Sequence, residues 1–401
     1  MTARAVVTGL GVVAPNGLGT TEYWTATRAG RGGIGRITRF DPSGYPARLA
    51  GEVPGFVARE HLPSRLLPQT DRMTRLALVA ADWALLDACV TPAEVPAFDM
   101  GVVTAASSGG FEFGQGELAK LWSLGGEHVS AYQSFAWFYA VNSGQISIRN
   151  GMKGPSGVLV SDQAGGLDAI AQARRQIRRG TPLVVTGAVD ASLCPWGWVA
   201  QLTSGRLSTR DDPDRAYLPF DADACGHVPG EGGAILILED ARGARDRGAR
   251  VYGEIAGYAA TFDPRPGTGG QPALARAIEL ALADAGAEPR DVDVVFADGA
   301  AVPELDRVEA EAVTAVLGRV PVTAPKTMTG RLYSGAGPLD VATALLSIAD
   351  GLVPPTTNVV PSPDYDLDLV TETRAVPVRC ALVLARGQGG FNSAVVVRAT
   401  Y

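Results

Sequence analysis

The chain has 401 residues, 46% of them hydrophobic and 19% charged, which excludes a disordered protein and suits two or three domains or one large layered unit. Its formal net charge of -7 gives no general attraction to a phosphate backbone, so we expect no nucleic-acid partner. Four scattered cysteines without a CxxC pair, and an N-terminus interrupted by glycine, predict a reduced cytoplasmic protein without a signal peptide.

The first predicted element is a buried strand over residues 5–13. Gly9, Gly11 and Ala14 match a GxGxxA dinucleotide-binding pattern, but Pro15 follows where the phosphate-binding helix would begin, so we expect no nucleotide. Further apolar runs alternate with helical patterns and predict an α/β fold. The other predicted strands cover residues 100–105, 158–160, 183–189, 234–238, 292–297, 381–385 and 394–397.

A segment at residues 129–148 carries no charge and is long enough to span a membrane, but its Ser, Gln and Asn side chains would be costly in lipid. We interpret it as buried or interfacial, and we expect no membrane association. Four aromatic residues within five positions suit either the core or an apolar subunit interface. The residues we assign to such an interface are Phe135, Trp137 and Phe138.

Two segments, residues 85–107 and 280–300, each contain a helix end, a proline-containing loop, an aspartate and an apolar strand. A repeat at nearly half the chain length predicts a duplicated α/β unit and not a solenoid. The charged, glycine-punctuated stretch at 240–250 is the expected division, which gives halves of 1–245 and 246–401. The three histidines are isolated from one another and from cysteine, so we expect no metal site.

A strand, a sharp turn and a helix are predicted across residues 154–180, because the apolar positions after Gln163 recur at helical spacing. Such a turn is a common place for a nucleophile, since helix N-terminal N–H groups lower the pKa of a thiol and stabilise an oxyanion. The helix also carries Arg174, Arg175, Arg178 and Arg179, which predict a solvated face or, less favoured, a dock for an acidic carrier protein.

The sequence SDQAGGLDA resembles the motif S-x-C-x-S/G-G-L-D/x-A of the beta-ketoacyl synthases, with Gln163 at the position of the nucleophilic cysteine. The two family histidines are also replaced: Asp298 stands in VVFADGAAV, and Arg331 stands in PKTMTGRLYSGAG, which keeps Lys326. An amide cannot accept an acyl group, and a carboxylate with a guanidinium cannot replace two neutral imidazoles. We expect Asp298 and Arg331 to form a salt bridge.

The resemblance extends over nearly the whole chain through RAYLPFDADACGHVPGEGGAILILED and GQGGFNSAVVV. Loss of all three condensing residues on this scaffold resembles the chain length factors, the beta subunits of type II aromatic polyketide synthases. The resemblance implies a thiolase-like fold with two duplicated halves in an α-β-α-β-α arrangement, and no cofactor. It also implies a heterodimer with a ketosynthase alpha subunit, an acyl carrier protein partner, and a tunnel for the growing poly-beta-ketone chain.

By position, the residues implied to shape the tunnel and set chain length are Phe111, Gly114, Leu118 and Trp196. Aromatic and aliphatic residues at helical spacing are also typical of a plain core, so this alternative stays open. The leading interpretation is a non-condensing subunit. The enzymatic alternative is a malonyl-carrier-protein decarboxylase that supplies the acetyl primer through Gln163, whereas an independent ketosynthase is contradicted by the missing triad.

Overall fold

The computed structural model describes residues 3–265 and 269–400, and its main feature is a mixed sheet in the order β13-β11-β10-β15-β16-β9-β1-β8-β7-β5-β6, with β2 paired to β1. The strands of this sheet are β1 (Ala5–Ala14), β2 (Gly17–Leu18), β5 (Met100–Ala105), β6 (Ser156–Leu159), β7 (Leu183–Asp190), β8 (Gly232–Asp240), β9 (Gly253–Phe262), β10 (Val294–Phe296), β11 (Pro321–Thr323), β13 (Asp368–Leu369), β15 (Cys380–Arg386) and β16 (Phe391–Arg398). Two short ribbons pair β3 (Ile34–Arg36) with β4 (Leu49–Gly51) and β12 (Leu352–Val353) with β14 (Arg374–Ala375).

The two halves of this sheet have the same topology. In the N-terminal half, β6, β5 and β7 are parallel neighbours, and β7, β8 and β1 are antiparallel neighbours. In the C-terminal half, β11, β10 and β15 are parallel, and β15, β16 and β9 are antiparallel. The matching strands β5 and β10 lie in the two segments that the sequence identified as similar, so the predicted duplication is confirmed.

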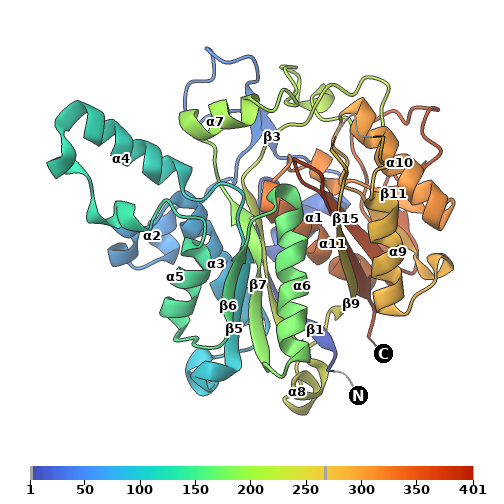
Figure 1. Ribbon diagram of the computed structural model, residues 1–401, viewed down its shortest axis with the longest axis horizontal. Helices are drawn as coiled ribbons and strands as arrows, with labels where there is room; N and C mark the ends of the chain where they lie inside the picture. The colour runs from blue at the N-terminus through green and yellow to red at the C-terminus, as the bar shows by residue number, and fades with distance from the viewer. Residues whose placement is uncertain (1–2, 266–268, 401) are drawn as a thin grey trace.

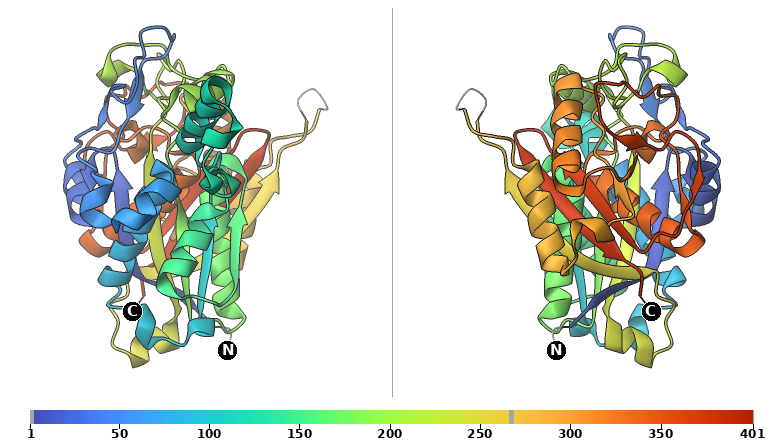
Figure 2. Two further views of the ribbon diagram at one scale, coloured as in Figure 1. Left: turned by 90° about the vertical axis from the view of Figure 1, so that its left-hand side faces the viewer. Right: turned by 90° about the vertical axis from the view of Figure 1, so that its right-hand side faces the viewer.

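Helices cover both outer faces and fill the space between the halves (Figure 1). The helix α3 packs on β1 and β8, α6 and α11 lie between the two half-sheets, and α9 packs on β9 and β16 beside α10. Figure 2 shows α9 and α10 in orange beside the red C-terminal strands. The helices are α1 (Thr20–Arg28), α2 (Ala58–His61), α3 (Arg72–Asp87), α4 (Phe111–Leu124), α5 (Val141–Asn150), α6 (Gly165–Arg178), α7 (Pro195–Leu202), α8 (Ala241–Asp246), α9 (Leu274–Ala285), α10 (Pro303–Leu317) and α11 (Ala336–Asp350).

The strand periodicity of two explains this layering. Along β8, Leu236 and Leu238 belong to the central core between the half-sheets, whereas Ile235 and Ile237 belong to the outer core beneath α3. The strands β15 and β16 alternate in the same way between the central core and the outer core beneath α9. One central core around α6 and α11 and two outer cores therefore hold five layers together, and the predicted α-β-α-β-α thiolase-like fold is confirmed.

The glycines of the apparent dinucleotide motif have a packing role. A Cβ atom built on Gly9 would lie 2.2 Å from the carbonyl oxygen of Ala84, and one on Gly11 would lie 1.9 Å from that of Ala80. The two glycines thus let β1 approach α3 closely, which accounts for the motif without a nucleotide. Within residues 3–265 and 269–400, no helix has both the length and the apolar character that a membrane span needs.

Candidate functional site

The turn between β6 and α6 has the predicted strand-turn-helix geometry. Asp162 adopts a left-handed conformation with φ 51°, and its carboxylate accepts a hydrogen bond from the amide of Gln388 at 2.7 Å. Its carbonyl oxygen accepts from the hydroxyl of Ser334 at 2.9 Å. These contacts fix the turn at the point where the resemblance places a nucleophile.

Gln163 follows this turn and is completely buried. Neither its Oε1 nor its Nε2 has a hydrogen-bond partner among the described residues. A buried amide without partners costs about 1–3 kcal/mol. Gln163 therefore stands where the family motif has a nucleophilic cysteine, but it cannot act as a nucleophile, because its amide nitrogen is delocalised.

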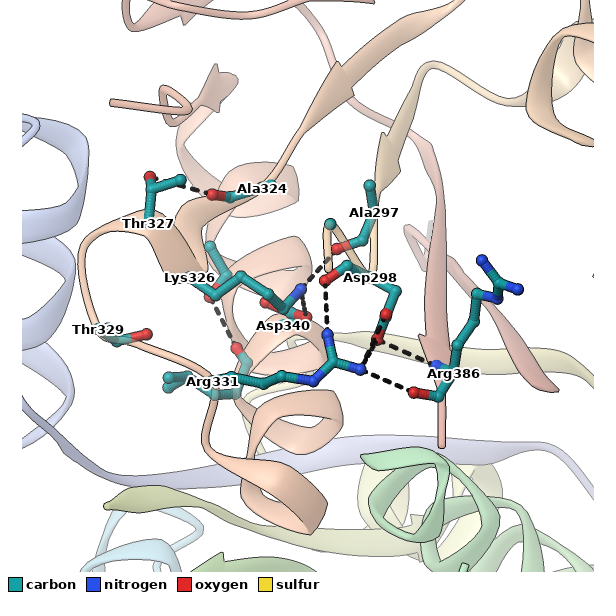
Figure 3. Close-up of polar contacts among 12 residues, drawn as sticks. Ala297, Asp298, Ala324, Lys326, Thr327, Thr329, Arg331, Asp340 and Arg386 are labelled. Carbon is teal, nitrogen blue, oxygen red and sulfur yellow. Dashed lines mark hydrogen bonds and ion pairs between the residues drawn. The ribbon is translucent and has the colours of Figure 1, made fainter. Parts of the chain in front are cut away.

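Asp298 and Arg331 meet as the sequence predicted (Figure 3). The Nη2 atom of Arg331 lies 2.9 Å from Oδ2 and 3.2 Å from Oδ1 of Asp298, and it also donates to the carbonyl oxygen of Arg386 at 2.7 Å. The amide of Arg386 donates to Oδ1 of Asp298 at 3.0 Å. Both charged groups are buried, so this pair is an internal one and differs from the weak exposed bridge that is common on surfaces.

Electrostatics keep the guanidinium charged. Burial alone lowers the pKa of Arg331, but the nearby charge of Asp298, with that of Asp162, raises that pKa above its ordinary value. Arg331 is thus a fixed cation with no proton to exchange near neutral pH. General acid-base chemistry of the kind that an imidazole performs is not available at this position.

Two further buried contacts hold the Asp298 loop in place. Glu309, on α10, accepts hydrogen bonds from the amides of Asp298 at 2.6 Å and of Gly299 at 2.9 Å. Lys326 donates from Nζ to the carbonyl oxygen of Ala297 at 2.5 Å and to Oδ2 of Asp340 at 2.6 Å (Figure 3). The lysine that the family motif keeps therefore serves here to position the backbone next to Asp298.

A cavity of about 860 Å³ opens in front of these residues. Its lining includes Asp162, Arg331, Tyr333 and Phe391, whereas Gln163 and Asp298 do not reach its surface. His227 also lines it, and burial followed by the charges of Arg331 and Arg206 holds the pKa of this imidazole well below its usual range. Across the described ranges, His, Cys, Asp and Glu side chains form no group of three that could bind a metal ion.

The tunnel residues predicted by position lie between α4 and α7. The ring of Phe111 stacks on that of Trp196 with centroids 4.7 Å apart and an interplanar angle of 9°. A Cβ atom built on Gly114 would lie 3.1 Å from Cζ3 of Trp196 and 3.5 Å from Cβ of Trp137. Phe111, Gly114 and Leu118 share one face of α4 by their spacing of three and four residues, and Leu118 is half-buried.

The predicted interface segment is exposed in the single chain. Trp137 and Phe138 expose 44% and 38% of their surface, and Phe135 is half-buried. Other exposed apolar side chains occur on α4, on α5, in the segment between these helices and directly after β6. This apolar surface consists of Leu121, Trp122, Leu124, Tyr132, Trp137, Phe138, Tyr139, Ile148 and Val160.

One expectation for α6 is wrong. Arg174 does not lie on a solvated face: it is buried, its Nη1 lies 2.5 Å from Oδ2 of Asp284, and it donates to the carbonyl oxygen of Ala256. Arg178 also approaches Asp284, at 3.5 Å. Arg174 and Arg178 therefore connect α6 to α9 and β9. Arg175 and Arg179 keep the predicted exposure, and neither forms an ion pair with a described residue.

Sequence reasoning did not identify Asp71, whose carboxylate contacts the first turns of both α3 and α4. The signal was present in part, because an aspartate directly before a helical pattern is typical of an N-cap. It also missed His227 at the cavity and Glu309 behind Asp298. No local pattern marks these two residues, since their partners are distant in the sequence.

Comparison with known proteins gives the family context. The model of the beta-ketoacyl synthase N-terminal domain matches residues 2–244, and that of the C-terminal domain matches residues 252–360. The chain is 63% identical over 398 residues to the actinorhodin polyketide putative beta-ketoacyl synthase 2 of Streptomyces coelicolor, with 98% of each chain covered. It is also 63% identical to the tetracenomycin polyketide synthase ketoacyl synthase beta subunit of Streptomyces glaucescens, over 99% of this chain and 98% of that one.

Solved structures agree with the fold. The ishigamide ketosynthase/chain length factor matches with a TM-score of 0.92 at 29% identity, covering 100% of both chains. A second match is the complex AntDE:AntF, a type II polyketide synthase acyl-carrier protein with its ketosynthase bound to the hexaketide. This match has a TM-score of 0.88 at 30% identity and also covers both chains completely.

Proposed function

The chain belongs to the beta-ketoacyl synthase family, and from this membership we propose that it is a chain length factor: a non-condensing subunit that pairs with a catalytic ketosynthase alpha subunit and shapes the tunnel in which an aromatic polyketide grows. The two relatives at 63% identity are polyketide proteins named as a second ketoacyl synthase or its beta subunit. The fold matches that of the ishigamide ketosynthase/chain length factor over the whole chain, so the proposed role uses the scaffold of a ketosynthase without its reaction.

The observation that carries the proposal is the buried ion pair of Asp298 and Arg331, together with the buried amide of Gln163. Decarboxylative condensation needs a thiolate to hold the acyl chain and neutral imidazoles to stabilise the enolate and oxyanion. Here the first position has an amide. The charged groups at the other two positions neutralise each other, and their hydrogen bonds to one another and to the carbonyl oxygen of Arg386 occupy them. The growing chain must then be held by the cysteine of the alpha subunit.

The apolar surface defined above supports the heterodimer. Its residues lie on α4, on α5, between these helices and directly after β6, and β6 is the last strand of the sheet and offers an unpaired edge. Large exposed apolar surfaces rimmed by polar residues mark protein interfaces, and an obligate partner is expected to cover this one. The acyl carrier protein is the second partner, and the poly-beta-ketone chain is the ligand that passes the residues between α4 and α7.

The chain-length role rests on Phe111, Gly114, Leu118 and Trp196. Three of them meet beside α7, where the ring of Phe111 stacks on that of Trp196 and Gly114 lies close to Trp196. We assign the passage for the growing chain to this place. A growing chain stops when its end meets side chains that cannot move aside, because overpacking a filled site costs about 1–3 kcal/mol. The size of these side chains then sets the length of the product.

The alternative, decarboxylation of a malonyl-carrier protein at Gln163, has one observation in its favour. Both polar atoms of the Gln163 amide lack partners among the described residues and could contact a thioester carbonyl. However, the side chain is completely buried behind the cavity lining, so the substrate could not reach it without a rearrangement. A heterodimer with Gln163→Ala separates the two readings, because loss of acetyl primer formation with unchanged extension from a supplied primer would favour the alternative.

The test of the proposed function is a reconstituted synthase of alpha subunit, acyl carrier protein and this chain, with the product masses measured. We expect a defined full-length polyketide only when this chain is present. A defined product of the same length from the alpha subunit and carrier protein alone would overturn the proposal.

We further propose a cytoplasmic location and halves of 1–245 and 246–401. The four cysteines are all free thiols, which suits a reducing compartment. The division lies near the end of α8, between the ranges 2–244 and 252–360 matched by the two family models. Expression of residues 246–401 alone, followed by circular dichroism, tests whether this half can fold independently.

A further inference from the structure

The first turn of α4 is held by side chains from other elements. Its N-cap residue is Gly110, which has no side chain to accept a hydrogen bond from the free amides of the turn. The carboxylate of Asp71 takes this place, because its Oδ2 accepts from the amide of Phe113, the third residue of α4, at 2.7 Å. This is the bond that an N-cap side chain normally makes within its own helix.

The same carboxylate caps a second helix. Asp71 is the N-cap of α3, and its Oδ1 accepts from the amide of Met73 at 2.8 Å. One buried carboxylate therefore joins the N-termini of α3 and α4, and both helix dipoles favour its charge. The fit is close, since a Cβ atom built on Gly110 would lie 2.8 Å from Cβ of Asp71.

Two other side-chain contacts hold the first half of α4. Arg39 pairs with Glu112 at 2.5 Å, and the side chain of Gln115 accepts from the amide of Trp196 at 2.6 Å. The Gln115 contact ties α4 to α7 directly across the passage, whereas Asp71 ties it to α3, which packs on the central sheet. The distance between the two walls of the passage thus depends on where the first turn of α4 is fixed.

We propose that Asp71 is a positioning residue for chain-length specificity, because it fixes the gate helix α4 on α3 and so sets the spacing of Phe111 and Gly114 from Trp196. This inference rests on the proposed function, since it assumes that these residues bound the passage. Asp71 itself is buried away from the cavity lining and does not contact the growing chain. Loss of its bond to Phe113 frees the first turn of α4 from α3, so the passage becomes wider and less uniform.

The test uses the reconstituted heterodimer with Asp71→Ser. Serine is a preferred N-cap and keeps the cap on α3, but its hydroxyl is too short to reach Phe113 as well. Asp71→Asn is a second variant of nearly native shape, in which one oxygen can still cap α3 while the amide nitrogen cannot accept a hydrogen bond. The control is Asp240→Ser, which alters an N-cap that serves only its own helix, α8, at the far end of the molecule (Figure 1).

We expect both Asp71 variants to form the heterodimer and to release a mixture of chain lengths in which at least a tenth of the product departs from the wild-type length. The Asp240→Ser synthase should keep a single length. A wild-type product distribution from an assembled Asp71 variant would overturn the inference, as would an equal broadening with Asp240→Ser. If only the inference fails, the Asp71 variants keep the wild-type product length but substitutions of Gly114 and Leu118 change it. If the proposed function fails, substitutions of Gly114 and Leu118 also leave the product length unchanged.

Discussion

The carboxylate of Asp298 and the guanidinium of Arg331 form a buried ion pair at 2.9 Å in the two positions where a condensing ketosynthase has histidines. Hydrogen bonds also join the pair to the end of β15, since the amide of Arg386 donates to Asp298 and the carbonyl oxygen of Arg386 accepts from Arg331. Buried pairs of this kind are costly to break from one side, because the remaining charge loses its partner in a low-dielectric interior.

The first prediction follows from this cost of removing only one partner of the pair. Arg331→Met should destabilise the folded chain by about 3–5 kcal/mol, because it leaves Asp298 charged, buried and unpaired. The double variant Asp298→Asn with Arg331→Met should be more stable than Arg331→Met alone, since the neutral amide can still accept from Arg386. Thermal melting of the wild type, Arg331→Met and the double variant at one pH measures the order of their stabilities. A double variant less stable than Arg331→Met would contradict this account of the pair.

The second prediction concerns the four thiols. Burial, ahead of nearby acidic groups, raises the pKa of both Cys194 and Cys380 to about 11, so about one in a thousand of these thiols is ionised at pH 8. Cys89 and Cys225 are exposed. Iodoacetamide at pH 8 should therefore label Cys89 and Cys225 well before the other two, as peptide mass spectrometry will measure, whereas all four should react in urea.

The second prediction extends to activity. Gln163, and not a reactive thiolate, lies at the turn before α6, so the isolated chain should have no condensing activity. Incubation with malonyl-carrier protein and an acyl donor should give no ketoacyl product by intact mass. An acyl adduct on any of the four cysteines that proceeds to a ketoacyl product would show that this chain has its own condensing site.

The third prediction tests the apolar surface. Trp137→Glu should weaken binding of the alpha subunit by about 2 kcal/mol or more, roughly 30-fold, because it places a charge in the apolar surface that we propose the partner covers. Leu280→Glu is the matched control: Leu280 exposes 36% of its surface and lies on α9, on the opposite side of the molecule from α4 (Figure 1). Titration of labelled alpha subunit measures both affinities, and equal effects of the two changes would place the interface elsewhere.

The fourth prediction is a pH dependence of stability from Asp71. Burial raises the pKa of its carboxyl to about 7, opposed by the amides of Phe113 and Met73 and by Arg75, while Glu112 adds to the rise. A carboxyl with a raised folded-state pKa contributes stability that is complete below its unfolded pKa near 4 and is lost as pH rises towards 7. The melting-temperature deficit of Asp71→Asn relative to wild type should therefore shrink between pH 5 and pH 8. A constant deficit would mean that Asp71 does not titrate in this range.

The sequence predicted eight strands of the duplicated unit but missed the short strand β11 and also β9, which lies in the middle of the sheet. The reason is clear for β9. Its residues, GEIAGYAATF, contain glycine and alanine where the other buried strands have Val, Leu or Ile. Gly257 in this strand shows the reason, because a Cβ atom there would lie 2.2 Å from the carbonyl oxygen of Ala281 in α9. Close packing against a helix thus removed the apolar run by which a buried strand is recognised.

The site was predictable where it depends on replacement of known motif residues, as for Gln163, Asp298 and Arg331. It was not predictable where the contact depends on the tertiary fold, as for the carbonyl oxygen of Arg386 beside Arg331. Arg174 lies between the two cases. Its position four residues after Ile170 and three before Ile177 puts it on the buried face of α6, so the helical spacing indicated burial that the run of arginines obscured.

The fifth prediction concerns the gate. Gly114→Thr together with Leu118→Phe should shorten the polyketide, because both changes add atoms to the face of α4 that lies opposite α7. At Gly114 the space is already tight, since a Cβ atom would be 3.1 Å from the ring of Trp196, and that ring is stacked on Phe111. Forcing extra atoms into such a site costs about 1–3 kcal/mol, which corresponds to roughly a tenfold shift from extension towards release.

Gly116 provides the control for this experiment, because it is in the same helix and a Cβ atom built on it meets nothing within 4 Å. Gly116→Thr makes the same change of helix propensity as Gly114→Thr, so any effect of threonine on the stability of α4 is common to both. The measurement is the mass distribution of products from the reconstituted synthase. Shorter chains from the Gly114 and Leu118 variant with unchanged chains from Gly116→Thr would locate the gate between α4 and α7, whereas unchanged length at normal yield would mean that this passage does not limit the product.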